Sequence, residues 1–488
     1  MLRKAQIIVL LVIAASSSAA QTPKGGDAIE RAAQAIGADG LTSIKYSGSG
    51  FNFALGQSVR PFAPWPKFNV KSYERAIDYN TATSREEMVR TQFENPPRGG
   101  GAQPIIGEQR QVQLVSGNYA WNVAGGNATP APAARIERSL QIWITPHGFV
   151  KAAQANNPQI RTARINGHRV DMVSFLVDGK FKVNGAIDDQ GLIEKVETWI
   201  PNPILGDMLV ETLYSDYKDL GGIKFPTRIV QKQGGFPTLD ISVTSVERNA
   251  GAVVAVPNNV RAAAAASPRV EVQKLADGVW YLTGGTHHSV LVQFKDHLVV
   301  IEAPLNDERS MAIIAEAKKL APNKPIRYVV ATHHHFDHSG GVGAYVGEGS
   351  TIITHQMNRI FFERSLRAPR TLSSDKHAKS KRLLKLMTMT EKRVLTDGGR
   401  VLELYHIKGS THNEGIIMAY MPKEKLLIEA DVYTPAAANT TAPPAPSPFT
   451  LNLYENLQQL HLDVEQIAPL HGRLVAMADL LKAIGKAP

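Results

Sequence analysis

The spacing of apolar residues changes near residue 250, and this change constrains the fold more than any other feature. Before that point apolar and polar residues alternate with a period of two, as in "LDISVTSVERN" at 239–249, which is typical of half-buried strands. Gly234 and Gly235 interrupt the alternation and predict a hairpin turn. Few segments have the spacing of a long helix. We therefore expect residues 27–255 to form a strongly curved, mostly antiparallel sheet with one or two helices.

The second half of the chain has a different pattern. Residues 249–272 are rich in Ala, Pro and Asn without periodicity, which indicates a linker, placed at 256–269. From 270 to 488 strands and helices alternate, with apolar strands such as "HLVVIEAP" and a helix that begins after Asn306. A chain of 488 residues is long for one domain. We expect two domains and an α+β fold overall.

The first twenty residues have the three parts of a secretory signal. Arg3 and Lys4 precede an apolar run at 7–15, and small residues follow up to Ala20. We expect residues 1–20 to be a cleaved signal peptide and the mature protein to be periplasmic or secreted in a bacterium. No later segment is long and apolar enough to predict a transmembrane helix.

Composition limits the metal ligands and the binding partners that this chain can have. The chain has no cysteine, so a metal site must use nitrogen and oxygen ligands. The net charge is +10, but the basic residues are not clustered with aromatic residues, so we expect no nucleic-acid partner. A small-molecule substrate is the expected partner, and the sequence does not indicate an oligomeric state.

The stretch "VVATHHHFDHSGG" at 329–341 is the strongest chemical signal. An apolar strand ends at its start, and alternate side chains of an extended chain share a face. His333 and His335 are therefore expected to point one way and His334 the other, in a structural or solvent-facing role. Asp337 and His338 form an adjacent pair before a turn rich in glycine. This spacing predicts a metal site.

Three further candidates lie at the ends of later strands. His412 lies in "HIKGSTHNEG", Asp431 ends "KLLIEAD" and His471 follows "QIAPL". In α/β proteins the ends of strands carry the chemistry, and a carboxylate that ends an apolar strand is costly unless it is paired or bound to a metal. His287 and His288, in "LTGGTHHSVLVQF", either line the mouth of the site or belong to a polar loop.

On these five segments, residues 270–488 resemble the metallo-β-lactamase superfamily, which implies an αββα sandwich. The resemblance assigns His333, His335 and His412 to a first zinc ion. It assigns Asp337, His338 and His471 to a second, with Asp431 bridging both. Two positions depart from the family pattern: Glu302 stands where an aspartate is usual, and Asn413 stands where many relatives have Thr or Ser.

The same resemblance implies a zinc-dependent hydrolase in which a metal-bridging hydroxide attacks the substrate and Asp337, as a catalytic residue, accepts a proton. A bridging carboxylate at Asp431 resembles the glyoxalase II, lactonase and phosphodiesterase-type members, so we expect an ester, thioester or lactone substrate. The substrate-binding residues are not indicated. Three alternatives remain: a persulfide dioxygenase-like oxidoreductase with one iron, a β-lactamase, and a non-catalytic envelope-binding protein.

The N-terminal half also has a weak family resemblance, and the C-terminal half has one strongly basic segment. "IGADGLTSIKYSGSGF" and "ETLYSDYKDLGGIKFPTRIVQKQGG" resemble the curved sheet of lipoprotein-carrier proteins. The segment 364–393 has ten Lys or Arg residues against two acidic ones. It is expected to be either a solvated helical surface or a basic lid over the site.

Overall fold

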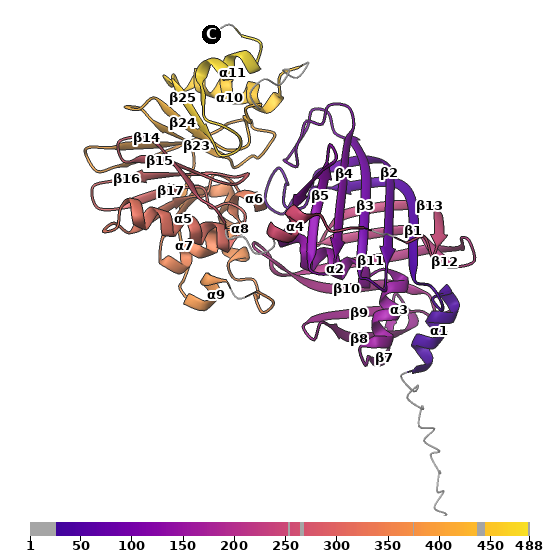
Figure 1. Ribbon diagram of the computed structural model, residues 1–488. Coiled ribbons are helices and arrows are strands. Elements are labelled where there is room, and N and C mark those ends of the chain that lie inside the picture. The colour runs from indigo at the N-terminus through magenta and orange to yellow at the C-terminus, as the bar shows by residue number, and fades with distance from the viewer. Residues whose placement is uncertain (1–25, 252–253, 264–267, 374, 437–444, 487–488) are drawn as a thin grey trace, which may run out of the picture.

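The computed structural model describes residues 26–251, 254–263, 268–373, 375–436 and 445–486. They form two lobes that lie side by side (Figure 1). The predicted signal peptide lies outside the described residues, so its prediction stays untested. Among the residues that are described, no helix is both long enough and apolar enough to cross a membrane.

The N-terminal lobe is built on one curved sheet of thirteen strands, all paired antiparallel, in the order β6-β5-β4-β3-β2-β1-β13-β12-β11-β10-β9-β8-β7. The strands are β1 (Ser43–Phe53), β2 (Lys67–Asp78), β3 (Thr83–Gln92), β4 (Gln109–Ser116), β5 (Tyr119–Ala124), β6 (Asn127–Pro130), β7 (Gln159–Ile165), β8 (His168–Val177), β9 (Phe181–Ile187), β10 (Ile193–Asn202), β11 (Gly206–Asp219), β12 (Lys224–Gln233) and β13 (Phe236–Arg248). The predicted hairpin turn at Gly234 and Gly235 is confirmed, because it joins β12 to β13.

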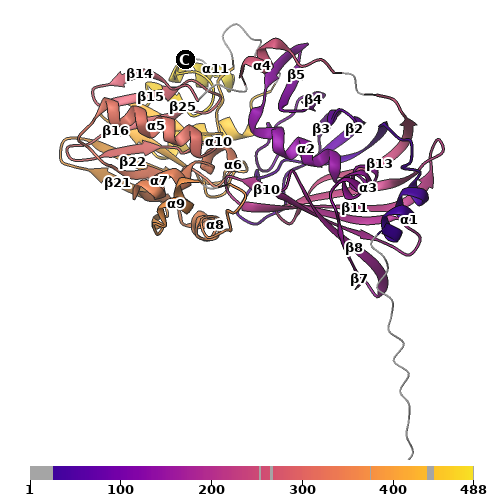
Figure 2. The same cartoon turned by 60° about the horizontal axis from the view of Figure 1, so that its bottom comes forward.

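Three α-helices accompany this sheet, so the expectation of one or two was wrong. They are α1 (Gly26–Ile36), α2 (Arg135–Trp143) and α3 (Pro146–Ala155). Short helices escape a search for long periodic segments. Thr145 caps α3 by accepting from the Gly148 amide, and Pro146 occupies its first turn, which ends α2 and restarts the chain as α3. Figure 2 shows α2 and α3 against the curved sheet, where they share its apolar core.

A polar cavity of about 310 Å³ lies between α2 and the curved sheet. Charged residues line it, among them Arg75, Glu86 and Glu137. Five glutamines also line it: Gln111, Gln113, Gln141, Gln231 and Gln233. The amides of Gln141, Gln231 and Gln233 bond to one another, and Gln233 also donates to Glu137, so this part of the sheet interior is hydrogen-bonded rather than apolar.

The predicted linker contains a short helix, α4 (Asn258–Ala263). Its Val260 is buried with Val112, Leu114 and Trp121 of the N-terminal sheet. Part of the segment that seemed featureless in sequence therefore packs on the N-terminal lobe. One apolar side chain is too little to produce a periodic pattern.

The C-terminal lobe contains two sheets. The first has the order of the chain, from β14 to β20, and comprises β14 (Glu271–Ala276), β15 (Val279–Thr283), β16 (Ser289–Gln293), β17 (Leu298–Ile301), β18 (Ile326–Val330), β19 (Thr351–His355) and β20 (Lys385–Met389). The second comprises β21 (Lys392–Thr396), β22 (Val401–His406), β23 (Ile417–Met421), β24 (Leu426–Glu429), β25 (Gln466–Pro469) and β26 (Val475–Ala476). Pairing is parallel from β17 to β20 and between β24 and β25.

Helices cover the outer faces of this sandwich (Figure 1). They are α5 (Asp307–Leu320), α6 (Phe336–Ser339), α7 (Val342–Glu348), α8 (Arg359–Ser365), α9 (Lys376–Ser380), α10 (Pro448–Gln459) and α11 (Met477–Ala483). Asn306 caps α5 as expected. One apolar core joins the two sheets and another joins the first sheet to α5 and α7. The predicted α+β fold, with an αββα sandwich after a curved antiparallel sheet, is confirmed.

The basic segment 364–393 packs on the protein rather than standing free. Arg370 donates to the carbonyl oxygens of Pro203 and Ile204 in the N-terminal lobe. Lys376 pairs with Glu348, and Arg382 donates to the Glu348 carbonyl at the end of α7.

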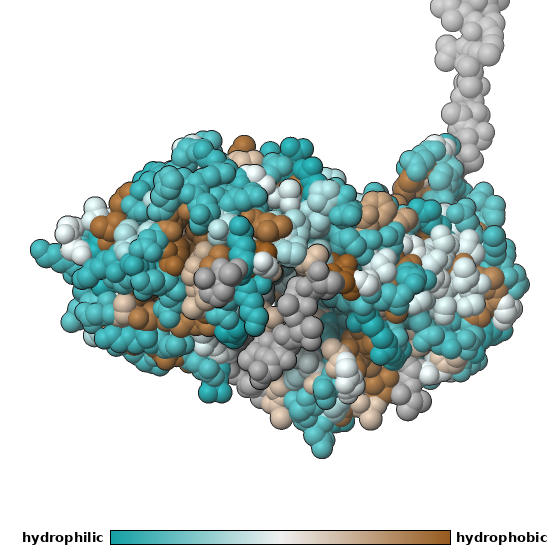
Figure 3. All heavy atoms as spheres, turned by 90° about the horizontal axis from the view of Figure 1, so that it is seen from above, coloured by the Kyte–Doolittle hydropathy of each residue, from teal (hydrophilic) through white to brown (hydrophobic). Residues whose placement is uncertain are grey.

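The surface of both lobes is mostly hydrophilic on the face that Figure 3 shows, with apolar residues scattered among the hydrophilic ones.

Candidate metal centre

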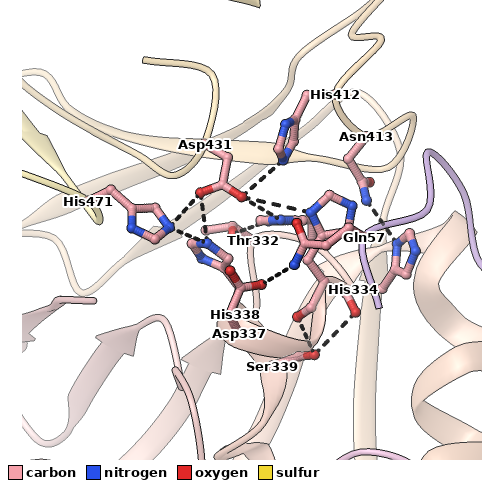
Figure 4. Close-up of polar contacts among 12 residues, drawn as sticks. Gln57, Thr332, His334, Asp337, His338, Ser339, His412, Asn413, Asp431 and His471 are labelled. Carbon is pink, nitrogen blue, oxygen red and sulfur yellow. Dashed lines mark hydrogen bonds and ion pairs between the residues drawn. The ribbon is translucent and has the colours of Figure 1, made fainter. Parts of the chain in front are cut away.

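Loops that follow strands bring the candidate ligands to one edge of the sandwich (Figure 4). β18 ends at Val330, and the chain then runs extended to His335 before α6. Asp431 and His471 each follow the end of a strand, β24 and β25, while His412 lies in the turn between β22 and β23. The parallel pairing of β24 with β25 places their carboxyl ends together. The seven predicted ligands therefore come from loops and the short helix α6 at one edge.

The first group consists of His333, His335, His412 and Asp431, whose ligand-type atoms all lie within 4.8 Å of one another. Asp431 Oδ2 is 3.0 Å from His412 Nε2, 3.4 Å from His333 Nε2 and 3.7 Å from His335 Nδ1. The side chains of His333 and His335 are fully buried. This part of the site is closed to solvent.

The second group consists of His287, Asp337, His338 and His471. His338 Nε2 lies 2.8 Å from His471 Nε2. His287 Nε2 donates to Asp337 Oδ2 at 3.2 Å. The side chains of Asp337 and His471 remain 32% and 20% exposed, so a molecule from solvent can reach the site from this side.

Asp431 lies between the two groups. Its Oδ2 faces the first group, while its Oδ1 is 2.7 Å from His338 Nε2 and 2.8 Å from His471 Nε2. One carboxylate thus presents a different oxygen to each set of imidazoles. This is the arrangement that a ligand bridging two cations requires.

The residues present fit metal ions, because buried ligand atoms converge without hydrogen bonds. His333 Nε2, His335 Nδ1, His412 Nε2 and Asp431 Oδ1 are buried and make no hydrogen bond. A buried polar atom without a partner is costly, and such atoms are rare in proteins. Imidazole and carboxylate ligands at this spacing suit a divalent metal.

Hydrogen bonds on the far ring nitrogens fix the orientation of three histidines. Thr332 donates its hydroxyl to Glu302 Oε2 at 2.5 Å, so its oxygen accepts from His333 Nδ1 at 2.9 Å. His338 Nδ1 donates to the same Glu302 Oε2 at 2.9 Å. His335 Nε2 donates to the Ser58 carbonyl at 2.9 Å. His333 and His335 therefore direct their unprotonated nitrogens toward Asp431, which is the orientation that metal ligands need. At His338 burial lowers the pKa, but Asp431 and Asp337 raise it well above its usual value, so this ring has to lose a proton when it binds a cation.

These bonds also explain the two departures from the family pattern. Glu302 is completely buried and orients both Thr332 and His338. Asn413 donates to His334 Nδ1 at 2.9 Å. His334 is therefore buried and structural, turned away from the site as expected, but it is not solvent-facing.

The two carboxylates and two of the imidazoles at the site have pKa values that favour their metal-binding forms. Burial alone would raise the pKa of Asp431, but His338, His471 and His412 hold it well below its usual range. Burial would also raise the pKa of Asp337, but the charge of His338 and the hydrogen bond from His287 lower it. Burial lowers the pKa values of His333 and His412. Both carboxylates are thus ionised and these two imidazoles neutral, the forms that bind cations.

Three residues beside the candidate ligands are not predicted as part of the site by the sequence. His287 was considered only for the mouth of the site, yet it belongs to the second group. Gln57 Nε2 donates to Asp337 Oδ1 at 2.7 Å, and Ser58 binds His335. Both lie in the loop between β1 and β2 of the N-terminal lobe, far from the motif in sequence. No local pattern signals a contact of this kind.

Comparison with known proteins identifies relatives of part of this chain. Residues 282–450 match the model of the metallo-beta-lactamase superfamily. A curated relative, the 2,4-dinitroanisole O-demethylase subunit alpha of a Nocardioides species, is 22% identical over 169 residues, which are 34% of this chain and 46% of that protein. The match thus spans about half the length of that relative.

Solved structures of metallo-beta-lactamases are also similar to the C-terminal lobe. The enzyme from Pontibacter korlensis is 20% identical, covering 44% of this chain and 98% of that chain, with a TM-score of 0.35. The enzyme from Hirschia baltica is 22% identical, covering 44% of this chain and 95% of that chain, with a TM-score of 0.34.

The C-terminal region of this protein belongs to the metallo-β-lactamase superfamily, as its αββα fold and the match over residues 282–450 show. The His and Asp residues of the two groups described above lie in this C-terminal region.

Proposed function

We propose that the protein is a hydrolase that uses two zinc ions to cleave an ester, thioester or lactone. The position of Asp431 carries this proposal. Its two oxygens face two separate sets of imidazoles, which suits a dinuclear centre rather than a single ion. His333, His335 and His412 would hold one ion, and Asp337, His338 and His471 the other, with His287 beside the second.

When bound, such a metal pair polarises the oxygen under attack and lowers the pKa of water to about 7. The residues of this chain orient that chemistry. Glu302 and Thr332 fix the rings of His333 and His338. Asp337 is ionised and partly exposed, so its carboxylate is placed to accept a proton beside the incoming substrate.

Two alternatives to a zinc hydrolase, an iron oxidoreductase and an envelope-binding protein, have less support. A mononuclear iron oxidoreductase needs only one ligand group, whereas two groups that share Asp431 favour two ions. A non-catalytic envelope-binding role, suggested by the likeness to lipoprotein carriers, gains little from the N-terminal cavity. Its lining of glutamines and charged residues does not suit an acyl chain, because burying these groups against hydrocarbon would cost several hydrogen bonds.

The curated relative supports a second candidate. Its name assigns it the O-demethylation of 2,4-dinitroanisole. Hydrolysis of that aryl ether would give 2,4-dinitrophenol and methanol, again by attack of water at an activated C–O bond. Cleavage of activated aryl ethers is therefore the second candidate activity for this chain.

A turnover screen with metal-defined enzyme tests these proposals. Metal-free protein is reloaded with zinc or iron and offered a thioester, a lactone, a carboxylic ester, a phosphodiester, a β-lactam, a persulfide with oxygen, and 2,4-dinitroanisole. We expect zinc-dependent turnover of an ester-type substrate, which a chelator abolishes. Activity only on the β-lactam, only with iron on a persulfide, or on no substrate at all would contradict the proposal.

Export is a separate proposal. The basic start, the apolar run and the small residues before Gln21 support a cleaved signal peptide. N-terminal sequencing of the protein from its natural source should give a chain that begins near Gln21. An intact Met1 in the cytosolic fraction would contradict it.

A further inference from the structure

The loop at residues 54–66, between β1 and β2, brings the N-terminal lobe to the metal centre. The loop is bonded to the backbone on both sides of the centre. The Phe336 amide donates to the Gly56 carbonyl at 3.3 Å, and the Glu414 amide donates to the Val59 carbonyl at 2.8 Å. These partners are neighbours of His335 and Asp337 on one side and of His412 on the other. The loop is therefore fixed against both ligand-bearing turns.

Gln57 extends from this loop into the site, as Figure 4 shows. Its Nε2 donates to Asp337 Oδ1 at 2.7 Å, and its Oε1 accepts from the Gly101 amide at 3.0 Å. The Gly101 amide can only donate, so the orientation of the Gln57 amide is determined rather than arbitrary. Asp337 thus has one oxygen held by the N-terminal lobe and the other directed toward His287.

The neighbouring residue acts on the first ligand group. The Ser58 carbonyl accepts from His335 Nε2 at 2.9 Å, which leaves His335 Nδ1 to face Asp431. Partners of this kind fix ring orientation and raise metal affinity. One short segment, Gln57 and Ser58, therefore contacts a predicted ligand of each metal.

Glycines allow this close approach. Gly56 has φ +75°, and a Cβ there would lie 2.3 Å from the ring of Phe336. A Cβ at Gly100 would lie 2.0 Å from Gln57 Oε1 and 3.0 Å from His335 Cε1. The run Gly99-Gly100-Gly101 thus forms a second wall, whose lack of side chains leaves space for the Gln57 amide.

We propose that Gln57 is a positioning residue for the second metal: the N-terminal lobe completes the metal centre by holding the carboxylate of Asp337. This inference rests on the proposed two-metal function. Without the Gln57 amide, the Asp337 carboxylate is free to rotate away from the orientation in which it binds a cation. Loss of an orienting partner typically weakens metal binding by about 10- to 100-fold.

The test is a zinc titration against a chromophoric chelator, starting from metal-free full-length protein. Gln57→Leu keeps the side-chain stem and removes the amide. We expect the dissociation constant of one of the two sites to rise about 10- to 100-fold, while that of the other changes less than about threefold. Gly100→Ala should shift the same site in the same direction, because its methyl group displaces the Gln57 amide.

Phe62→Ala is the matched control. Phe62 lies in the same loop and packs on Phe361, with ring centroids 6.3 Å apart. The described hydrogen bonds to the Asp337 carboxylate come from Gln57 and His287, not from Phe62. It should leave both zinc constants within about threefold of wild type. If Phe62→Ala weakens the second site as much as Gln57→Leu, loop docking rather than the amide is responsible, and the proposal is wrong.

Wild-type zinc constants in Gln57→Leu would also overturn the inference, whatever the enzyme hydrolyses. Conversely, wild-type protein that binds two zinc ions but turns over no substrate contradicts the proposed function and leaves this inference standing. If Gln57→Leu does not fold, as judged by circular dichroism, Gly100→Ala supplies the decisive titration.

Discussion

His147 in the N-terminal lobe and His335 in the C-terminal lobe are both completely buried. Both donate one ring nitrogen to a backbone carbonyl, of Ile36 and of Ser58 respectively. In both, the other ring nitrogen lacks a hydrogen bond. His147, however, stacks on Phe225 with ring centroids 5.8 Å apart, whereas His335 faces three other ligand-type side chains within 4.8 Å.

The difference teaches that burial alone does not identify a functional histidine. A neutral imidazole has one nitrogen without a proton, and among apolar neighbours that atom simply remains unbonded. What distinguishes the C-terminal lobe is that several such atoms converge on one carboxylate, Asp431. Within the described ranges, the groups of ligand-type residues spaced for a metal all lie in the C-terminal lobe.

The largest expected effect separates the two lobes directly. His335→Ala removes a ligand of the first metal, and because a bound metal supplies several kcal/mol of transition-state stabilisation, we expect turnover to fall by at least about 100-fold. The same change at His168, an exposed histidine of the N-terminal lobe that pairs with Glu194, should leave turnover unchanged. Circular dichroism should show an intact N-terminal sheet in both variants. Near-wild-type turnover and full metal content in His335→Ala would remove His335 from the site.

The next effect concerns the carboxylate on which both groups converge. Asp431→Asn keeps the shape of the side chain but removes a charge that two cations would compensate. We expect zinc occupancy and turnover to fall together, the latter by roughly 10- to 100-fold, as for loss of an important metal contact. Asp463→Asn, at an exposed partner of Lys425, is the control. Unchanged zinc stoichiometry and rate in Asp431→Asn would exclude a bridging role.

The third prediction concerns stability in acid. Burial lowers the pKa of His147 to about 4, with Lys151 and Arg248 opposing protonation and the Ile36 carbonyl favouring it. The unfolded chain has a histidine pKa of about 6.5 and takes up a proton below that pH, whereas the folded state does not until about pH 4. Stability is therefore fully present above pH 6.5 and falls by up to roughly 3 kcal/mol between pH 6.5 and 4.

Tryptophan fluorescence can measure this change, because four of the five tryptophans, Trp65, Trp121, Trp143 and Trp199, lie in the N-terminal lobe. Urea unfolding of His147→Gln should show a shallower loss of stability over the same pH range than wild type, even if its stability at pH 7 is lower. Parallel pH dependences in the two proteins would show that His147 does not produce the acid sensitivity.

The smallest expected effect concerns the basic segment. Arg382 is bonded to the end of α7, and Arg370 to the N-terminal lobe, so this segment packs as a surface. Replacing Lys379, Lys381 and Arg382 by Ala should change efficiency on an anionic substrate less than about twofold, at any salt concentration, as for ordinary surface substitutions. A basic lid predicts instead a loss of about tenfold or more at low salt. Comparing anionic and neutral substrates over a salt series distinguishes the two.

The sequence predicts the parts of the site that depend on local chain geometry. The extended run from His333 to His335 alternates its side chains, and Asp431 and His471 follow apolar strands that could be recognised individually. The alternation of strands and helices after residue 270 predicts an α/β domain, and the resemblance to the metallo-β-lactamase superfamily implies its αββα layers. Even the contrast between His334 and its neighbours depends only on the direction of successive side chains.

The remaining parts depend on contacts between distant segments. Gln57 lies 280 residues before Asp337, and nothing in "ALGQSVRP" distinguishes it from a surface glutamine. His287 joins the second group only because its bridge partner in the backbone is His471. The helices α2 and α3 are short, and only Ile144 and Thr145 lie between them, so tertiary packing rather than periodicity defines them.

The central claim is that one carboxylate organises two metal ions in the C-terminal lobe. Elemental analysis of the purified wild-type protein, after removal of loosely bound metal and reconstitution with zinc, tests it most directly. We predict close to two zinc ions per chain, decreasing in Asp431→Asn. One iron per chain in the protein as isolated, or a single zinc that further addition does not increase, would contradict the two-metal account.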